Sequence, residues 1–98
     1  MIEIRKTRLF EQWLASLRDA QARIRILARI DRLAFGNPGQ HRVLRKGVCE
    51  MKIDHGPGYR VYFTRQGDTW VLLLCGGDKK SQRADIAAAL VMVDELEN

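Results

Sequence analysis

The sequence predicts a small α+β domain, with an antiparallel sheet of about four strands and helices packed mainly on one face. Three observations support this fold class. Apolar residues recur at three- and four-residue steps over residues 9–34, strand-like runs follow between residues 48 and 75, and an amphipathic stretch closes the chain. The expected element order is strand, helix, helix, strand, strand, strand, helix. A length of 98 residues suits a single domain over residues 1–98.

The first third of the chain predicts one strand and two helices. Residues 2–6 alternate apolar and polar side chains, as a short half-buried strand does. Thr7 and Asp19 are good N-cap residues, so we expect helices over about residues 7–18 and 19–35. Their apolar positions have helical spacing: Leu9, Phe10, Trp13, Leu14 and Leu17, then Ala20, Ile24, Leu27, Ile30, Leu33 and Ala34.

The rest of the chain predicts three strands and a third helix. Residues 36–39 (GNPG) end the second helix, and a basic connector follows over residues 41–47. Strand-like runs then occupy residues 48–53, 59–65 and 69–75, separated by short turn-forming segments. Gly76 and Gly77 are expected to break the last strand, and the apolar spacing over residues 85–96 predicts a C-terminal helix.

Charge and composition narrow the classes of partner. The chain has 17 Lys and Arg against 12 Asp and Glu, and most of this excess lies in its first half. Such a balance suits either a polyanion or an acidic protein partner. The apolar runs are far too short for a membrane span, and residues 1–8 hold no signal-peptide core. Cys49 and Cys75 lack a disulfide or metal spacing, so we expect a cytoplasmic protein with reduced thiols.

The two strands predicted at residues 48–53 and 59–65 carry the most informative pattern. Each has one polar face, and directly paired residues of a hairpin point the same way. The simplest register that matches the two polar faces gives three pairs: Ile53 with Tyr59, Lys52 with Arg60, and Glu50 with Tyr62.

This register sets two cations side by side, which destabilises a sheet unless an anion binds between them. Glu50 shares their face, and Lys79, Lys80 and Arg83 follow the neighbouring strand. A carboxylate among cations can take a proton from a ribose 2′-hydroxyl while the cations hold the phosphate. The alternative is an ordinary solvated sheet face. His41 and His55 stand alone in the sequence, so we expect no metal and no cofactor.

A second basic pattern lies on the helix predicted over residues 19–35. The arginines at positions 18, 25, 29 and 32 fall on one side at helical spacing. Three interpretations are open: a track for nucleic-acid phosphates, a solvated face, or a docking surface for an acidic partner segment.

Several motifs together resemble the RelE/ParE superfamily of toxins from type II toxin–antitoxin modules, and in particular its HigB-like addiction module killer proteins. The resemblance covers essentially the whole chain. It depends on the early Phe10, Trp13, Leu14 and Leu17 pattern and on the segments 36–39 (GNPG), 50–54 (EMKID), 56–63 (GPGYRVYF) and 72–82 (LLLCGGDKKSQ).

The resemblance implies a fold like that of microbial ribonucleases and a ribosome-dependent mRNA endoribonuclease that uses 2′-hydroxyl attack without a metal. It implies a cognate HigA-like helix-turn-helix antitoxin as partner, besides the ribosome and mRNA, with operator DNA contacted only through the antitoxin complex. By this resemblance, we expect Arg60 to stabilise the charge of the transition state and Glu50 to act as the general base. The predicted catalytic set is Glu50, Arg60 and Lys79, and the predicted substrate-binding set is Lys52, Tyr62, Lys80 and Arg83.

The sequence departs from the best-known nucleases of this superfamily after the last strand. They often carry a Tyr or His there as stacking group or general acid, whereas this chain has Ser81-Gln82-Arg83-Ala84-Asp85. Lys79, Lys80 or Tyr62 would then serve as the acid. The departure also favours two alternatives: a ParE-like inhibitor of DNA gyrase, and a non-catalytic protein that binds its antitoxin and helps it repress their operon. We expect antitoxin contact on the two N-terminal helices.

Overall fold

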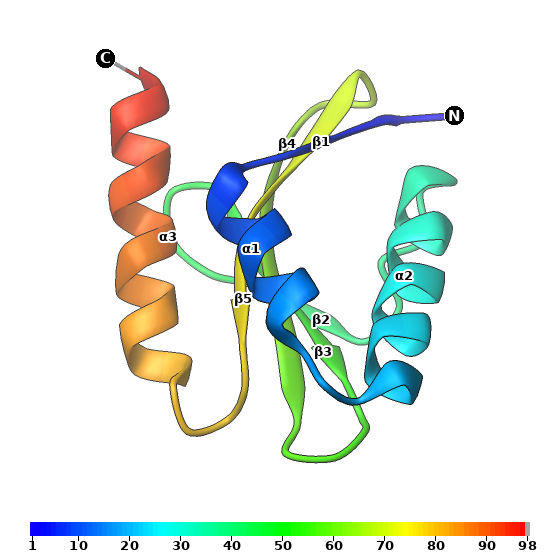
Figure 1. Cartoon of the computed structure of the whole chain (residues 1–98). Coiled ribbons are helices and arrows are strands. Elements are labelled where there is room, and N and C mark those ends of the chain that lie inside the picture. The colour runs from blue at the N-terminus through cyan, green and yellow to red at the C-terminus, as the bar shows by residue number, and fades with distance from the viewer. Residues whose placement is uncertain (98) are drawn as a thin grey trace.

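A computed structural model describes residues 1–97 and shows a five-stranded sheet with three helices (Figure 1). The elements in chain order are β1 (Glu3–Lys6), α1 (Arg8–Ser16), α2 (Ala20–Ala34), β2 (His41–Val43), β3 (Val48–Ile53), β4 (Tyr59–Gln66), β5 (Trp70–Gly77) and α3 (Gln82–Glu97). The predicted α+β class and the predicted elements are confirmed, to within a few residues at their ends. No helix in the described part of the chain is long and apolar enough to cross a membrane.

The sheet corrects two details of the prediction. Its strand order is β1-β5-β4-β3-β2, and β1 pairs parallel to β5, so the sheet is mixed rather than antiparallel. The additional strand is β2, which lies inside the segment predicted as a basic connector and pairs antiparallel with β3. All three β2 residues are exposed, so this edge strand has no buried face to give it an apolar alternation.

The helices occupy both faces of the sheet rather than mainly one (Figure 1). On one face, residues of α1 and α2 such as Phe10 and Ile26 pack against Met51 and Phe63. On the other face, α3 buries Ala89, Leu90 and Val93 against Val48, Tyr62 and Leu74. The polar face of the β3–β4 hairpin is therefore partly covered by α3, and the part beside α3 contributes to the floor of a pocket.

Both predicted N-caps are present. The Thr7 hydroxyl oxygen accepts a hydrogen bond from the Phe10 amide at 3.0 Å, and the Asp19 carboxylate accepts from the amides of Gln21 and Ala22. These bonds satisfy amides that the first turn of a helix leaves without partners. The Thr7 hydroxyl also donates to the Leu74 carbonyl at 2.6 Å, which ties the start of α1 to β5.

Gly76 and Gly77 belong to β5 and do not break it, contrary to the prediction. Both are needed for close packing. A Cβ on Gly76 would lie 2.6 Å from Cδ2 of Trp13, and a Cβ on Gly77 would lie 2.6 Å from the Ser81 hydroxyl. The pair lets α1 and the start of α3 approach β5 from opposite sides.

We predict that Gly76→Ala lowers the free energy of unfolding by about 1–3 kcal/mol, because the methyl group overpacks the Trp13 ring. Denaturant unfolding followed by circular dichroism measures the change. In a Trp13→Ala background the same substitution should cost much less, since the ring is gone. Equal costs in the two backgrounds would show that the contact with Trp13 is not the cause.

Candidate functional site

The β3–β4 hairpin has the register predicted from its polar faces. Lys52 pairs with Arg60, Glu50 with Tyr62, and Ile53 with Tyr59, as expected. The edge strand β2 adds Arg42 opposite Glu50. Since directly paired residues share a face, these polar side chains gather on the side of the sheet where α3 begins.

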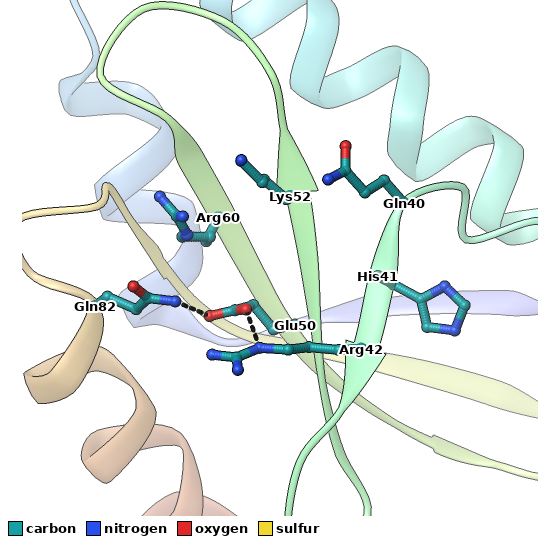
Figure 2. A pocket seen from close by; sticks show the side chains of 7 residues that line it. All are labelled: Gln40, His41, Arg42, Glu50, Lys52, Arg60 and Gln82. Carbon is teal, nitrogen blue, oxygen red and sulfur yellow. Dashed lines mark hydrogen bonds and ion pairs between the residues drawn. The ribbon is translucent and has the colours of Figure 1, made fainter.

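The gathered side chains line an open pocket of about 400 Å³ (Figure 2). Strands β2, β3 and β4 form its floor, and the first residue of α3 closes one side. The lining residues are Gln40, His41, Arg42, Glu50, Lys52, Arg60 and Gln82. Glu50 is the only carboxylate among them, against three permanent cations, so the pocket favours an anionic ligand.

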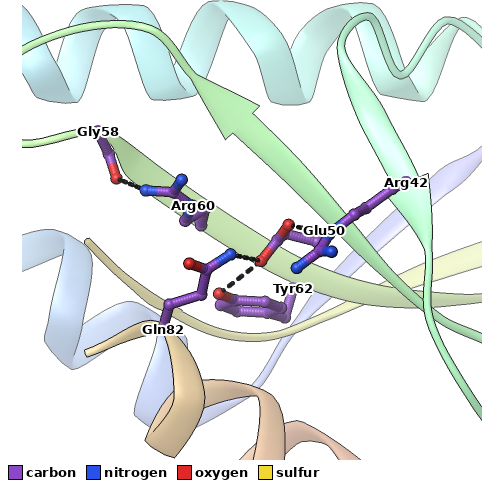
Figure 3. A network of polar contacts seen from close by, with 6 residues as sticks. All are labelled: Arg42, Glu50, Gly58, Arg60, Tyr62 and Gln82. Atoms are coloured by element: carbon purple, nitrogen blue, oxygen red, sulfur yellow. Dashed lines mark hydrogen bonds and ion pairs between the residues drawn. The ribbon is translucent and has the colours of Figure 1, made fainter. Parts of the chain in front are cut away.

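Glu50 is the centre of a hydrogen-bond network (Figure 3). The residue is only 5 % exposed. Arg42 Nε donates to its Oε1 at 2.6 Å, and Gln82 Nε2 and the Tyr62 hydroxyl donate to its Oε2 at 2.9 and 3.0 Å. Burial alone would raise the pKa of Glu50, but these three hydrogen bonds outweigh it and lower the pKa. Glu50 is therefore ionised at neutral pH.

Tyr62 has a different place from the one predicted for a stacking group. Its ring is fully buried under α3, so a nucleobase cannot stack on it. Burial and the hydrogen bond to Glu50 raise the pKa of its hydroxyl. The full burial of the ring contradicts the predicted stacking role of Tyr62, and its hydroxyl donates to the Glu50 carboxylate.

Arg60 is a buried cation without a carboxylate partner among residues 1–97. It is 7 % exposed, and its Nη1 donates to the Gly58 carbonyl at 2.6 Å (Figure 3). Its Nε is buried and has no hydrogen-bond partner in the part of the chain that the structure describes. An unpaired buried donor costs about 1–3 kcal/mol. Lys52, directly opposite on β3, forms no ion pair within the described residues. Arg60 and Lys52 are thus adjacent cations whose positive charge a bound anion would neutralise.

The three predicted basic residues after β5 do not line this pocket. Lys79 and Lys80 line a second open pocket with Pro57 and Asp78. Gly58 lies between Arg60 and Lys79, since a Cβ there would be 3.0 Å from Arg60 Nη1 and 3.9 Å from Lys79 Cβ. Arg83 is exposed on the first turn of α3. The structure therefore brings Lys79 next to the main pocket and leaves Arg83 outside both linings.

Sequence reasoning missed three residues of the pocket: Gln40, Arg42 and Gln82. Arg42 falls in the segment predicted as a connector, and no sequence pattern marks Gln40. Gln82 stands in the segment after the last strand that lacks a Tyr or His, and it is not predicted as a site residue. The pairing of Arg42 with Glu50 could be found only after β2 is recognised as a strand. His41 also borders the pocket, but its ring points away from Glu50 (Figure 2) and its Nδ1 lies 2.8 Å from the Gly39 carbonyl oxygen.

The predicted arginine stripe of α2 is divided by the structure. Arg18, Arg25 and Arg32 are exposed, but Arg29 turns toward the end of β3 and donates to backbone carbonyls there. A continuous phosphate track of four arginines is therefore not present. Within residues 1–97, no group of three or more His, Cys, Asp or Glu side chains is arranged to hold a metal ion.

Fold and pocket together define a small α+β domain with a basic, solvent-open pocket that contains one buried carboxylate. Residues 12–91 match the profile of the family described as "Phage derived protein Gp49-like (DUF891)". The chain is also 45 % identical over 95 residues to a Haemophilus influenzae (strain ATCC 51907 / DSM 11121 / KW20 / Rd) protein described as "Uncharacterized protein", covering 97 % of this chain and 96 % of that one. The chain belongs to the Gp49-like family, and the wider RelE/ParE relationship stays a prediction.

Proposed function

We propose that this protein is the toxin of a type II toxin–antitoxin module and that it cleaves mRNA on the ribosome. Membership of the Gp49-like family supports the toxin–antitoxin role. The observation that carries the nuclease assignment is the buried Arg60, with a free Nε beside Lys52 and the ionised Glu50. A phosphodiester supplies the anion that these cations lack, and a ribose 2′-hydroxyl supplies the proton that a carboxylate accepts.

Arg60 and Lys52 hold the scissile phosphate in this proposal. The guanidinium of Arg60 and the ammonium group of Lys52 donate charge-assisted hydrogen bonds to its non-bridging oxygens. Negative charge grows on those oxygens as the 2′-oxygen attacks phosphorus, so both cations bind the transition state more tightly than the substrate. Because Arg60 is buried and held by the Gly58 carbonyl, little reorganisation is needed during the reaction.

Glu50 accepts the proton of the attacking 2′-hydroxyl. A bond forms from the 2′-oxygen to phosphorus and the bond from phosphorus to the 5′-oxygen breaks, which leaves a 2′,3′-cyclic phosphate and a 5′-hydroxyl. In the free protein Oε1 accepts one hydrogen bond and Oε2 accepts two, so we expect the incoming RNA to displace Arg42 or Gln82 as its 2′-hydroxyl approaches Glu50. Arg42 suits this exchange because its side chain is 57 % exposed and can turn to a phosphate.

The leaving 5′-oxygen needs a proton from a general acid. Tyr62 is a poor candidate because its side chain is fully buried and its hydroxyl already donates to Glu50. The ammonium groups of Lys52 and Lys79 remain, the first in the pocket and the second at its border. Lys80 lines the adjoining pocket, where it can contact a neighbouring phosphate of the same strand.

The chemistry is tested by the ends of the cleaved RNA. Cleavage products made by the purified toxin on translating ribosomes should carry 2′,3′-cyclic phosphates. An mRNA with a single 2′-deoxy nucleotide at the cleavage position should resist the toxin there and nowhere else. Cleavage that persists at the deoxy position would exclude attack by the 2′-hydroxyl.

A ParE-like gyrase inhibitor is the second candidate. The absence of a Tyr or His after β5 favours it, since Gln82 in that segment binds Glu50 and has no acid–base chemistry of its own. This candidate predicts that expression of the protein stops DNA replication before translation and leaves mRNA intact. A non-catalytic co-repressor predicts neither effect.

We also propose that the antitoxin binds the outward face of α2. This face exposes apolar side chains, with Ile24 at 59 % and Leu27 at 42 %. Arg25 and Arg32 follow on the same helix and are exposed. An amphipathic helix of the antitoxin with acidic flanks complements such a surface. The pocket lies on the opposite side of the sheet, so variants of the exposed apolar residues Ile24 and Leu27 should keep their activity.

We predict that Ile24→Asp weakens binding of the antitoxin by about 30-fold or more, as expected for a central apolar contact. Calorimetry with the purified antitoxin measures the change. Val91→Asp on α3 is the matched control, because Val91 is 56 % exposed on a different helix. Equal loss of affinity in the two variants, or none in Ile24→Asp, would show that the antitoxin binds elsewhere.

A further inference from the structure

Arg29 makes contacts that neither the RNA-track nor the solvated-face interpretation of α2 explains. Its Nη1 donates to the Lys52 carbonyl at 2.6 Å, and its Nη2 donates to the carbonyls of Pro38 and Gln40 at 2.8 and 3.0 Å. One planar guanidinium thus gathers three backbone oxygens from two separate segments. Its Nε is buried and has no hydrogen-bond partner.

Two of the three carbonyls belong to residues that line the candidate site. Gln40 and Lys52 both line the main pocket, and the Lys52 amide donates to the Gln40 carbonyl at 3.1 Å. Arg29 therefore holds the start of β2 against the end of β3. Arg42, the ion-pair partner of Glu50, lies two residues beyond Gln40, and Lys52 is the residue that faces Arg60.

The turn before β2 is shaped to admit Arg29. Gly39 has a φ of +64°, and a Cβ there would lie 2.8 Å from Arg29 Nη2 and 3.1 Å from its Cζ. The Gly39 amide also donates to the Asn37 side-chain oxygen at 3.0 Å. The glycine is thus required twice, once for its backbone conformation and once for the space that the guanidinium occupies.

We propose that Arg29 is a positioning residue of the site, which sets the distance of Lys52 and Arg42 from Arg60 by clamping the carbonyls of Lys52, Pro38 and Gln40. This inference rests on the proposed anion-binding function of the pocket. It assigns to α2 a role in the reaction although the helix lies on the opposite face of the sheet. Arg29 does not touch the substrate, so its effect passes through the backbone of β2 and β3.

Two independent substitutions should remove the clamp. Arg29→Met removes the donors and keeps much of the side-chain length. Gly39→Ala keeps Arg29 and pushes its guanidinium away. Each has a matched control. Arg32→Met removes an exposed cation one turn further along α2, and Gly36→Ala imposes a methyl group on another positive φ, +90°, with nothing within 4 Å. Arg29→Lys keeps the charge and at least one of the bonds.

The measurements are the affinity for inorganic phosphate, from an NMR titration that follows the Lys52 amide, and the single-turnover rate of mRNA cleavage on ribosomes. We expect both Arg29→Met and Gly39→Ala to weaken phosphate binding and slow cleavage about tenfold, with partial recovery in Arg29→Lys. The two controls should stay within twofold of the wild type. Circular dichroism and thermal unfolding establish that each variant is folded.

The inference fails if folded Gly39→Ala and Arg29→Met bind phosphate as the wild type does, or if the controls lose as much affinity as the clamp variants. Failure of the proposed nuclease has another signature. In that case the wild type binds phosphate and cuts no mRNA. The phosphate titration alone then still tests whether Arg29 positions the phosphate-binding residues. A wild type that binds no phosphate overturns both.

Discussion

Arg60→Ala is expected to slow mRNA cleavage by about 10²–10³-fold, the usual effect of removing one preorganised donor to a developing charge. Arg60 is largely buried and held by the Gly58 carbonyl, so Lys52 and the more exposed Arg42 are not expected to replace its preorganised donors. The single-turnover rate on mRNA bound to ribosomes measures the loss. Because the chemical step is affected, kcat should fall more than the affinity for the ribosome.

Two further variants make the Arg60 result interpretable. Arg65 lies on the same strand as Arg60 and forms an ion pair with Asp68 at the exposed turn. The Arg65→Ala variant should therefore cleave mRNA at the wild-type rate. Arg60→Lys keeps a charge but loses the planar fork of donors, so it should recover only part of the activity. Cleavage by folded Arg60→Ala at a rate near that of the wild type would show that Arg60 takes no part in the reaction.

Glu50→Gln is expected to reduce cleavage by about 10²–10⁴-fold, since it removes the group that accepts the 2′-hydroxyl proton. Asp54→Asn is the matched control, because Asp54 follows the same strand, is exposed and should be dispensable. If Glu50→Gln cleaved as fast as Asp54→Asn, the carboxylate would serve only to hold Arg42, Gln82 and Tyr62 in place.

The pH dependence follows from the direction of the Glu50 shift. Its pKa is lowered in the folded protein, so the unfolded chain binds more protons in the acid range. The stability that Glu50 contributes is present above its unfolded pKa of about 4.3 and is lost as pH falls through the lower folded value. If cleavage depends on ionised Glu50, its rate should not change between pH 6 and 8 through titration of Glu50. Arg42→Ala removes a hydrogen bond that lowers the pKa of Glu50, so the acid side of the pH–rate profile should move to higher pH.

The hairpin of the site could be predicted from the sequence because strand alternation fixes which residues share a face. Once the polar faces of residues 48–53 and 59–65 are matched, the register that pairs Lys52 with Arg60 is the simplest solution, and it is the one observed. The N-caps Thr7 and Asp19 were predictable for a similar reason, since each acts on amides only two or three residues away.

The surroundings of Glu50 could not be predicted because they depend on tertiary packing. Arg42 reaches it from an exposed three-residue strand too short to show a periodic pattern, and Gln82 reaches it because α3 packs on the face that was expected to be free. The same packing buries Tyr62. Gly76 and Gly77 look like a strand break in the sequence, whereas the rings and side chains stacked on them are visible only in three dimensions.

The most direct test of the nuclease assignment is primer extension on a defined mRNA in a purified translation system, with and without ribosomes, using wild type, Arg60→Ala and Glu50→Gln. Cuts within codons that require ribosomes and are lost in both variants are the expected result. Intact mRNA with the folded wild-type toxin would contradict it. Inhibition of gyrase by the same preparation would then support the ParE-like alternative.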